Sequence, residues 1–141
     1  MNQKYRVAVV GYGNIGRYAL DAIKASPDFE LAGVVRRSLT EKQPSTLQDI
    51  PVVTSIDALG KVDVALLCIP TRAVEEYALE ILSRGIATVD TFDIHSGIVP
   101  FRRSLHAAAI AHNTVAVLSA GWDPGSDSMV RTLMEAIVPR G

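Results

Sequence analysis

The chain has 141 residues, of which 48% are hydrophobic, so it is long enough to bury the core of one domain. Its 14 basic and 15 acidic residues nearly cancel, which argues against nucleic-acid binding and favours small molecules or proteins as partners. No apolar run approaches the roughly 18 residues needed to span a bilayer, and no signal-like segment precedes the first strand, so we expect a cytoplasmic protein without membrane contact.

The single cysteine, Cys68, excludes an internal disulfide. We expect it to be a small core residue at the end of a strand, with a chemically silent thiol. The three histidines lack the spacing of metal ligands, so no metal site is expected.

The first predicted element is a valine-rich strand at residues 5–10, which runs into the turn Gly11-Tyr12-Gly13-Asn14-Ile15-Gly16 and a helix over residues 15–25. Gly11 permits a tight turn, Gly13 lets the backbone approach a pyrophosphate, and Gly16 lets the helix pack closely on the strand. The turn is therefore predicted to bind a dinucleotide, with a purely structural turn as the alternative. The apolar face of the helix is expected to hold Ile15, Ala19, Ala22 and Ile23.

The second predicted strand, at residues 30–35, is followed by Arg36, Arg37 and Ser38. A fold that prefers NAD usually carries an acidic residue here, which would repel the additional phosphate of NADP. Guanidinium groups bind that phosphate through charge-assisted hydrogen bonds, and a serine hydroxyl adds a donor. The sequence therefore predicts NADP as the cofactor. The alternative is that both arginines are solvated surface charges.

Strands and helices alternate along the rest of the chain, after a polar connection at residues 38–49 that we expect near the adenosine end of the cofactor. Strands are predicted at residues 52–54, 62–67, 87–89 and 114–118, and helices at 56–59, 73–82, 101–112 and 126–137. This alternation predicts an α/β fold, a Rossmann-type doubly wound parallel sheet formed by residues 1–141 as one domain.

The segment Cys68-Ile69-Pro70-Thr71-Arg72 lies between a strand and a helix, at the same edge of the sheet as the glycine turn. We expect it to pass the cofactor. Pro70 shapes the turn, Thr71 is predicted to cap the following helix, and Arg72 is available to a phosphate or ribose. The alternative leaves the threonine as a cap only and the arginine as a surface residue.

Two carboxylates follow strands at the same edge. Asp90 comes directly after the strand at residues 87–89, and Asp123 lies in the loop after the strand at 114–118. Ligands of open α/β sheets bind outside the carboxyl ends of the strands, so both acids are predicted to face the ammonium group of an amino acid beside the nicotinamide. Turn formation is the alternative role, and we expect it for Asp93 and Asp127. Trp122 is predicted to wall the substrate pocket or pack over the nicotinamide, and otherwise to anchor its loop.

Four motifs together resemble the meso-diaminopimelate dehydrogenase family. They are Val10-Gly11-Tyr12-Gly13-Asn14-Ile15-Gly16-Arg17, Arg36-Arg37, Val89-Asp90-Thr91-Phe92-Asp93-Ile94-His95 and Ser119-Ala120-Gly121-Trp122-Asp123-Pro124-Gly125. The resemblance implies an NADP-dependent, reversible oxidative deamination of meso-2,6-diaminopimelate at its D-centre, giving L-2-amino-6-oxopimelate, ammonia and NADPH. In the reverse direction the reaction serves lysine and cell-wall precursor synthesis.

The resemblance also implies roles for individual residues. The glycine turn would hold the pyrophosphate through Gly11, Gly13, Asn14, Ile15 and Gly16. Arg36, Arg37 and Ser38 would hold the 2′-phosphate, and residues 68–72 would line the cofactor. Asp90 and Asp123 would meet the amino group at the D-centre, and Trp122 would close that end of the pocket.

Members of this family are much longer than this chain. The part beyond residue 141 would supply the remaining substrate contacts and most of a homodimer interface, so we expect a cofactor-binding portion that ends early in the family's second domain, with an uncovered face on its sheet. The alternatives are a non-catalytic NADP-binding module and a related D-amino-acid dehydrogenase.

Overall fold

The computed structural model describes residues 4–39, 43–122 and 126–139. Its sheet has six parallel strands in the order β3-β2-β1-β4-β5-β6. The strands are β1 (Tyr5–Val10), β2 (Phe29–Val35), β3 (Val52–Val53), β4 (Val64–Leu67), β5 (Ala87–Asp90) and β6 (Ala116–Val117). The helices are α1 (Asn14–Ala25), α2 (Thr71–Leu82), α3 (Ile98–Ala111) and α4 (Ser126–Ile137), with 3₁₀ turns at Ser45–Leu47, Ile56–Leu59 and His95–Gly97.

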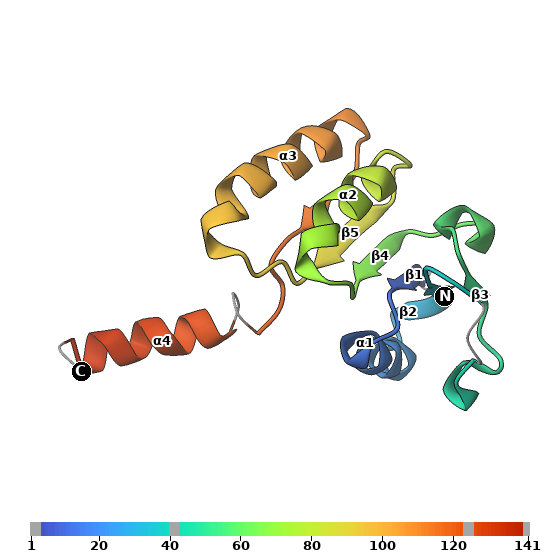
Figure 1. The fold of residues 1–141 in the computed structure, drawn as a ribbon, viewed down its shortest axis with the longest axis horizontal. Helices are drawn as coiled ribbons and strands as arrows, with labels where there is room; N and C mark the ends of the chain where they lie inside the picture. Colours follow the sequence, from blue (N-terminus) through green and yellow to red (C-terminus); the bar gives the residue numbers. More distant parts are fainter. Residues whose placement is uncertain (1–3, 40–42, 123–125, 140–141) are drawn as a thin grey trace.

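The chain begins at the centre of the sheet, builds β2 and β3 on one side, and then crosses back to add β4, β5 and β6 on the other (Figure 1). This arrangement is the predicted Rossmann-type doubly wound sheet, which is confirmed. The strand order reverses between β1 and β4, and such a switch point is where open α/β sheets bind ligands, beyond the carboxyl ends of their strands.

Side chains of β1 alternate between two hydrophobic cores, as the period of two in a strand requires. Val7 and Val9 pack with Leu20 and Ile23 of α1, whereas Ala8 and Val10 belong to the core beneath α2 and α3. Figure 1 shows α1 on one side of the sheet and α2 with α3 on the other. Burial on both faces explains the near-continuous apolar run of this strand.

The face of the sheet that α1 covers is less protected on the β4–β5 side. Val64, Leu66 and Val89 are only half-buried, whereas Ala65 and Leu67, which point toward α2, are buried. α1 packs on β1 and β2. The observation agrees with the expected uncovered face.

α4 has the predicted bounds, but it buries no side chain. Its apolar residues Met129, Leu133 and Ile137 are 76%, 60% and 65% exposed. Figure 1 shows the helix extending away from the sheet. No helix in the described ranges is long and apolar enough to cross a membrane.

The predicted apolar face of α1 is partly wrong. The helix buries Gly16, Leu20 and Ile23, whereas Ile15 is 56% exposed and Ala22 is also exposed. Gly16 lies against the glycine turn, where a Cβ would stand 2.2 Å from the carbonyl oxygen of Gly11. Leu20, four residues later, lies on the same side of the helix and is buried with it. The start of α3 also differs from the prediction. The helix begins at Ile98 and not at residue 101, because Pro100 is tolerated in its first turn.

Candidate functional site

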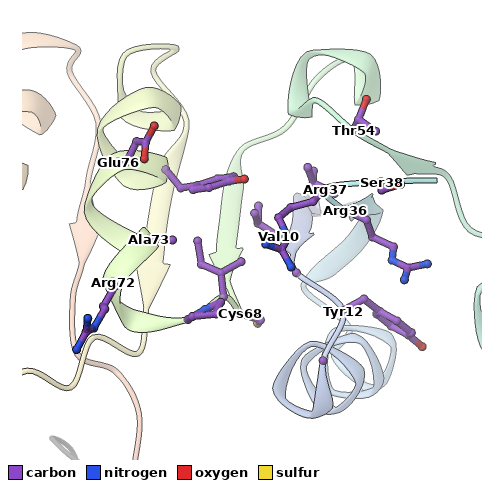
Figure 2. A pocket seen from close by; sticks show the side chains of 16 residues that line it. Val10, Tyr12, Arg36, Arg37, Ser38, Thr54, Cys68, Arg72, Ala73 and Glu76 are labelled. Carbon is purple, nitrogen blue, oxygen red and sulfur yellow. The ribbon is translucent and has the colours of Figure 1, made fainter. Parts of the chain in front are cut away.

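A cleft of about 640 Å³ opens at the carboxyl ends of β1, β2 and β4, at the switch point of the sheet (Figure 2). Its lining comes from the glycine turn, the end of β2, the turn after β4 and one side of α2. The lining residues are Val10, Gly11, Tyr12, Gly13, Val35, Arg36, Arg37, Ser38, Thr54, Cys68, Ile69, Pro70, Arg72, Ala73, Glu76 and Tyr77. Most of the predicted cofactor residues therefore meet at one place. Asn14, Ile15, Gly16 and Thr71 are not among the lining residues.

Gly11 requires glycine for two reasons. Its φ of +93° lies in the left-handed region, and a Cβ there would stand 2.4 Å from the carbonyl oxygen of Cys68. Gly16 requires glycine for the second of these reasons, since a Cβ there would lie 2.2 Å from the carbonyl oxygen of Gly11. The close packing predicted for Gly16 is thus mainly against the turn itself, with Val9 of β1 at 3.5 Å.

Gly13 precedes α1 and faces open space, because a Cβ built on it would have no heavy atom within 4 Å. Its position is the N-cap, where it provides no side-chain hydrogen bond to the first turn of α1. The first amide groups of an α-helix have no intrahelical acceptor and lie at the positive end of the helix dipole. The residues present therefore fit a pyrophosphate at this helix start.

Arg36, Arg37 and Ser38 follow β2 and line the cleft together. The backbone N–H of Arg36 donates to the carbonyl oxygen of Val53 at 2.8 Å, which holds this segment against β3. Arg37 is exposed and forms no hydrogen bond or ion pair within the described part of the chain. Its guanidinium group is therefore available to an anion.

The polar connection between β2 and β3 contacts the glycine turn. The hydroxyl groups of Tyr12 and Thr46 are 2.7 Å apart and form a hydrogen bond. Leu47 of the same connection is fully buried in the core beneath α1. These two contacts keep the connection next to the end of the cleft that holds Arg36 and Ser38.

The turn after β4 forms the floor of the cleft. The backbone N–H of Cys68 donates to the carbonyl oxygen of Val10 at 2.8 Å, so the ends of β4 and β1 stay together. Burial raises the pKa of the Cys68 thiol to about 11. The thiol is therefore protonated at neutral pH, as a chemically silent cysteine requires.

The prediction that Thr71 caps α2 is wrong. Pro70 occupies the N-cap position, and Thr71 is the first residue of the helix. The hydroxyl of Thr71 instead donates a hydrogen bond of 2.6 Å to Oδ1 of Asp93. A carboxylate is a stronger acceptor than a neutral group, so this bond links the turn after β4 to the loop after β5.

Asp90 ends β5 and is 1% exposed. Its Oδ1 accepts hydrogen bonds from the backbone N–H groups of Phe92 at 2.9 Å and Ser119 at 3.0 Å. Its Oδ2 is buried and has no hydrogen-bond partner among the described residues. Burial raises the pKa of this carboxyl, against the opposing effect of the two hydrogen bonds. The free oxygen can accept a proton or a hydrogen bond from a ligand amino group.

The loop after β6 runs along Asp90. The backbone N–H of Ala120 donates to the carbonyl oxygen of Asp90 at 2.8 Å, and the hydroxyl of Ser119 donates to that of Phe92 at 2.9 Å. Trp122 at the end of this loop is 68% exposed, so it is not a buried anchor. Asp123, the second predicted carboxylate, lies outside the described residues.

Sequence reasoning missed the α2 wall of the cleft, which is made by Ala73, Glu76 and Tyr77. Tyr77 also packs partly on the core beneath α2. These three residues are spaced i, i+3 and i+4 directly after the turn at residues 68–72. This spacing places them on one side of the helix and could have indicated that they face the cleft. No group of three or more His, Cys, Asp or Glu side chains in the described ranges is arranged to hold a metal ion.

A protein-family model described as "Oxidoreductase family, NAD-binding Rossmann fold" matches residues 5–90, which contain the glycine turn, Arg36, Arg37 and the strands β1 to β5. The chain belongs to this oxidoreductase family. Its Rossmann fold is the arrangement that the strand order displays.

Within this oxidoreductase family, the chain is similar to proteins named meso-diaminopimelate D-dehydrogenase. It is 62% identical to the one from Bacteroides fragilis over 99% of the chain and 46% of that protein. It is 36% identical to the one from Corynebacterium glutamicum over 94% of the chain and 41% of that protein. The chain thus spans less than half the length of these relatives.

Two solved structures resemble the whole described fold. A C. glutamicum DAP dehydrogenase in complex with DAP matches 97% of the chain and 42% of its own, with a TM-score of 0.79 and 34% identity. An engineered D-amino acid dehydrogenase bound to NADP+ matches 96% of the chain and 42% of its own, with a TM-score of 0.78 and 35% identity. An NAD(P) cofactor is therefore supported for the oxidoreductase fold of this chain.

Proposed function

We propose that this chain is the NADP-binding portion of a meso-diaminopimelate dehydrogenase. With the remainder of the enzyme it would catalyse the reversible conversion of meso-2,6-diaminopimelate, water and NADP to L-2-amino-6-oxopimelate, ammonia and NADPH. The proposal rests on one observation. The glycine turn, which has open space beside Gly13, lines the same cleft as Arg36 and Arg37. The 62% identity to the B. fragilis enzyme supports the choice of substrate.

NADP is proposed over NAD because the end of β2 presents cations and no carboxylate to the cleft. Arg37 is uncommitted within the described ranges, and Arg36 and Ser38 line the same wall. Guanidinium groups suit a phosphate monoester through charge-assisted, often bidentate hydrogen bonds. The NADP+ bound to the engineered D-amino acid dehydrogenase is consistent with this choice.

Asp90 is proposed to receive a hydrogen bond, and then a proton, from the amino group at the D-centre. Its buried Oδ2 lacks a partner among the described residues, and the raised pKa of the carboxyl makes it a stronger base than an ordinary aspartate. Hydride can leave the carbon only when the nitrogen lone pair is free. NADP supplies the hydride acceptor when bound. Asp123 and Trp122 are proposed to complete this end of the site.

The proposed domain is residues 1–141, which would end early in the second domain of the longer relatives. The half-buried face of β4 and β5 and the exposed apolar side of α4 support a role for additional chain. That chain would supply the distal substrate contacts and most of a homodimer interface. A cytoplasmic location belongs to the same proposal, since the reaction draws on dissolved NADP.

The test is a chimaera in which residues 1–139 replace the matching portion of the B. fragilis relative. We expect meso-diaminopimelate-dependent formation of NADPH, and its loss in the same chimaera with Asp90→Asn. A folded chimaera without this activity would contradict the proposal.

The second candidate is a non-catalytic NADP-binding module. It is favoured because the cofactor cleft is lined by this chain, whereas Trp122 near Asp90 is exposed. NADP binding by the chain without turnover in the chimaera would support the module. A related D-amino-acid dehydrogenase would be identified if D-lysine or another D-amino acid replaced meso-diaminopimelate as the best substrate.

A further inference from the structure

The α2 wall of the cleft carries a carboxylate that the proposed chemistry does not use. Ala73, Glu76 and Tyr77 face the cleft from α2, and Glu76 forms no hydrogen bond or ion pair within the described part of the chain. Arg72, four residues earlier, is the helical neighbour that would ordinarily pair with it. Figure 2 shows the Arg72 side chain pointing away from Glu76, toward the start of the helix.

A carboxylate in a cleft that binds a polyanionic cofactor is electrostatically unfavourable. Each phosphate of NADP would repel it, and this repulsion has no benefit unless the carboxylate meets a hydrogen-bond donor. The base of the adenosine half offers one such donor on its edge, the exocyclic amino group of adenine. The placement of Glu76 therefore has a chemical counterpart in the proposed ligand.

The wall opposite Glu76 marks where that base would lie. Arg36, Arg37 and Ser38 are the proposed partners of the 2′-phosphate, which is carried by the ribose that also bears the adenine. Arg37 and Thr54 extend the same wall of the cleft, and Figure 2 shows them across the cleft from Ala73 and Glu76. An uncommitted guanidinium group can stack on a planar base, and a small alanine opposite leaves room for it.

We propose that Glu76 reads the adenine base, by accepting a hydrogen bond from its exocyclic amino group while the base lies between Arg37 and the α2 wall. The inference rests on the proposed cofactor function and adds a specificity residue to it. Hypoxanthine has a carbonyl oxygen in place of the amino group. Because this oxygen and the Glu76 carboxylate both accept hydrogen bonds, they would repel each other.

The experiment is calorimetric titration of this chain with NADP and with nicotinamide hypoxanthine dinucleotide phosphate. We expect the chain to bind NADP at least about tenfold more tightly than the hypoxanthine analogue, because a hydrogen bond to a charged group contributes that much free energy. In Glu76→Gln the preference should fall to about twofold, because the amide can accept from adenine or donate to hypoxanthine. Glu75→Gln is the matched control: Glu75 is exposed on the same helix but does not line the cleft, so this variant should keep the full preference.

The outcomes separate the two proposals. Equal binding of both dinucleotides by the unaltered chain, or an unchanged preference in Glu76→Gln, would overturn the role of Glu76 and leave the cofactor proposal standing. Failure of a folded chain to bind either dinucleotide would overturn both.

Discussion

The two ends of the sheet's carboxyl edge differ in how far this chain encloses them. At the cofactor end, the glycine turn, Arg36–Ser38 and the turn after β4 surround one cleft. At the other end, Asp90 is buried with one oxygen that has no hydrogen-bond partner among the described residues, Trp122 is 68% exposed and α4 buries no side chain. At the cofactor end, the hydrogen bonds that pair β1 with β2 and with β4 hold the segments of the site together.

The same contrast appears in the packing. β1 is buried on both faces, by α1 on one side and by the core beneath α2 and α3 on the other. Within the described ranges β6 pairs with β5 alone, and its Val117 is 45% exposed. A site at the β1–β4 junction is therefore supported within the chain, whereas a site near β5 and β6 depends on additional apolar contacts.

The largest effect is expected at the glycine turn. Gly11→Ala should lower the free energy of unfolding by about 2–6 kcal/mol, because it combines a strained φ with a Cβ that collides with a carbonyl oxygen. It should also remove NADP binding. Gly13→Ala is the control: with open space around its Cβ, it should cost less than about 1 kcal/mol of stability while still weakening NADP binding. Urea denaturation and calorimetry measure the two quantities, and equal destabilisation by both variants would contradict the role given to Gly11.

The second prediction concerns the choice of cofactor. Replacing Arg36 and Arg37 by Gln should weaken NADP binding by about 1.5–3 kcal/mol for each arginine, and NAD binding far less. Arg72→Gln makes the same chemical change at the α2 side of the cleft, and should affect both cofactors alike. Titration with each dinucleotide measures the effect. Equal losses for NADP and NAD in the double variant would show that these arginines do not bind the 2′-phosphate.

The third prediction concerns Asp90 and pH. Because burial raises the pKa of Asp90 above its ordinary value of 3.8, the folded state favours the protonated carboxyl. Its contribution to stability is thus present below pH 3.8 and is lost as the pH rises through the higher pKa of the folded state. Asp90→Asn removes this titration and keeps an oxygen acceptor for Phe92 and Ser119. The unfolding free energy of the variant, relative to the unaltered chain, should therefore increase from acidic to neutral pH. Parallel pH profiles would contradict the assignment.

The smallest effect is expected at Thr71. Thr71→Val removes the hydroxyl that donates to Asp93, and should cost about 0.5–1.5 kcal/mol of stability, since the bond is exposed to water. Thr71→Ser keeps the hydroxyl and should restore most of it. Denaturation midpoints would measure the difference. Because Thr71→Val keeps the methyl group and Thr71→Ser keeps the hydroxyl, a loss in Thr71→Ser as large as that in Thr71→Val would contradict the role given to the hydrogen bond.

Local pattern predicted much of the fold. The valine-rich strand, the glycine turn and the following helix were recognisable because each has its own residue period and its own backbone requirement. The bounds of α4 were also predicted correctly, since its amphipathic period is local. Thr71 was assigned the wrong role because Asp93, the acceptor of its hydroxyl, comes from a different strand-to-helix loop.

The sequence by itself determined the doubly wound α/β order, the cofactor class and the residues of the glycine turn, since these follow from composition and spacing along neighbouring residues. Only the tertiary structure decided that Glu76 and Tyr77 share a cleft with Arg37, that the buried Oδ2 of Asp90 has no hydrogen-bond partner among the described residues, and that α4 buries no side chain. The reason is that the chain crosses from β3 back to β4. That crossing brings together side chains which no periodicity connects, and it sets which of them are removed from water.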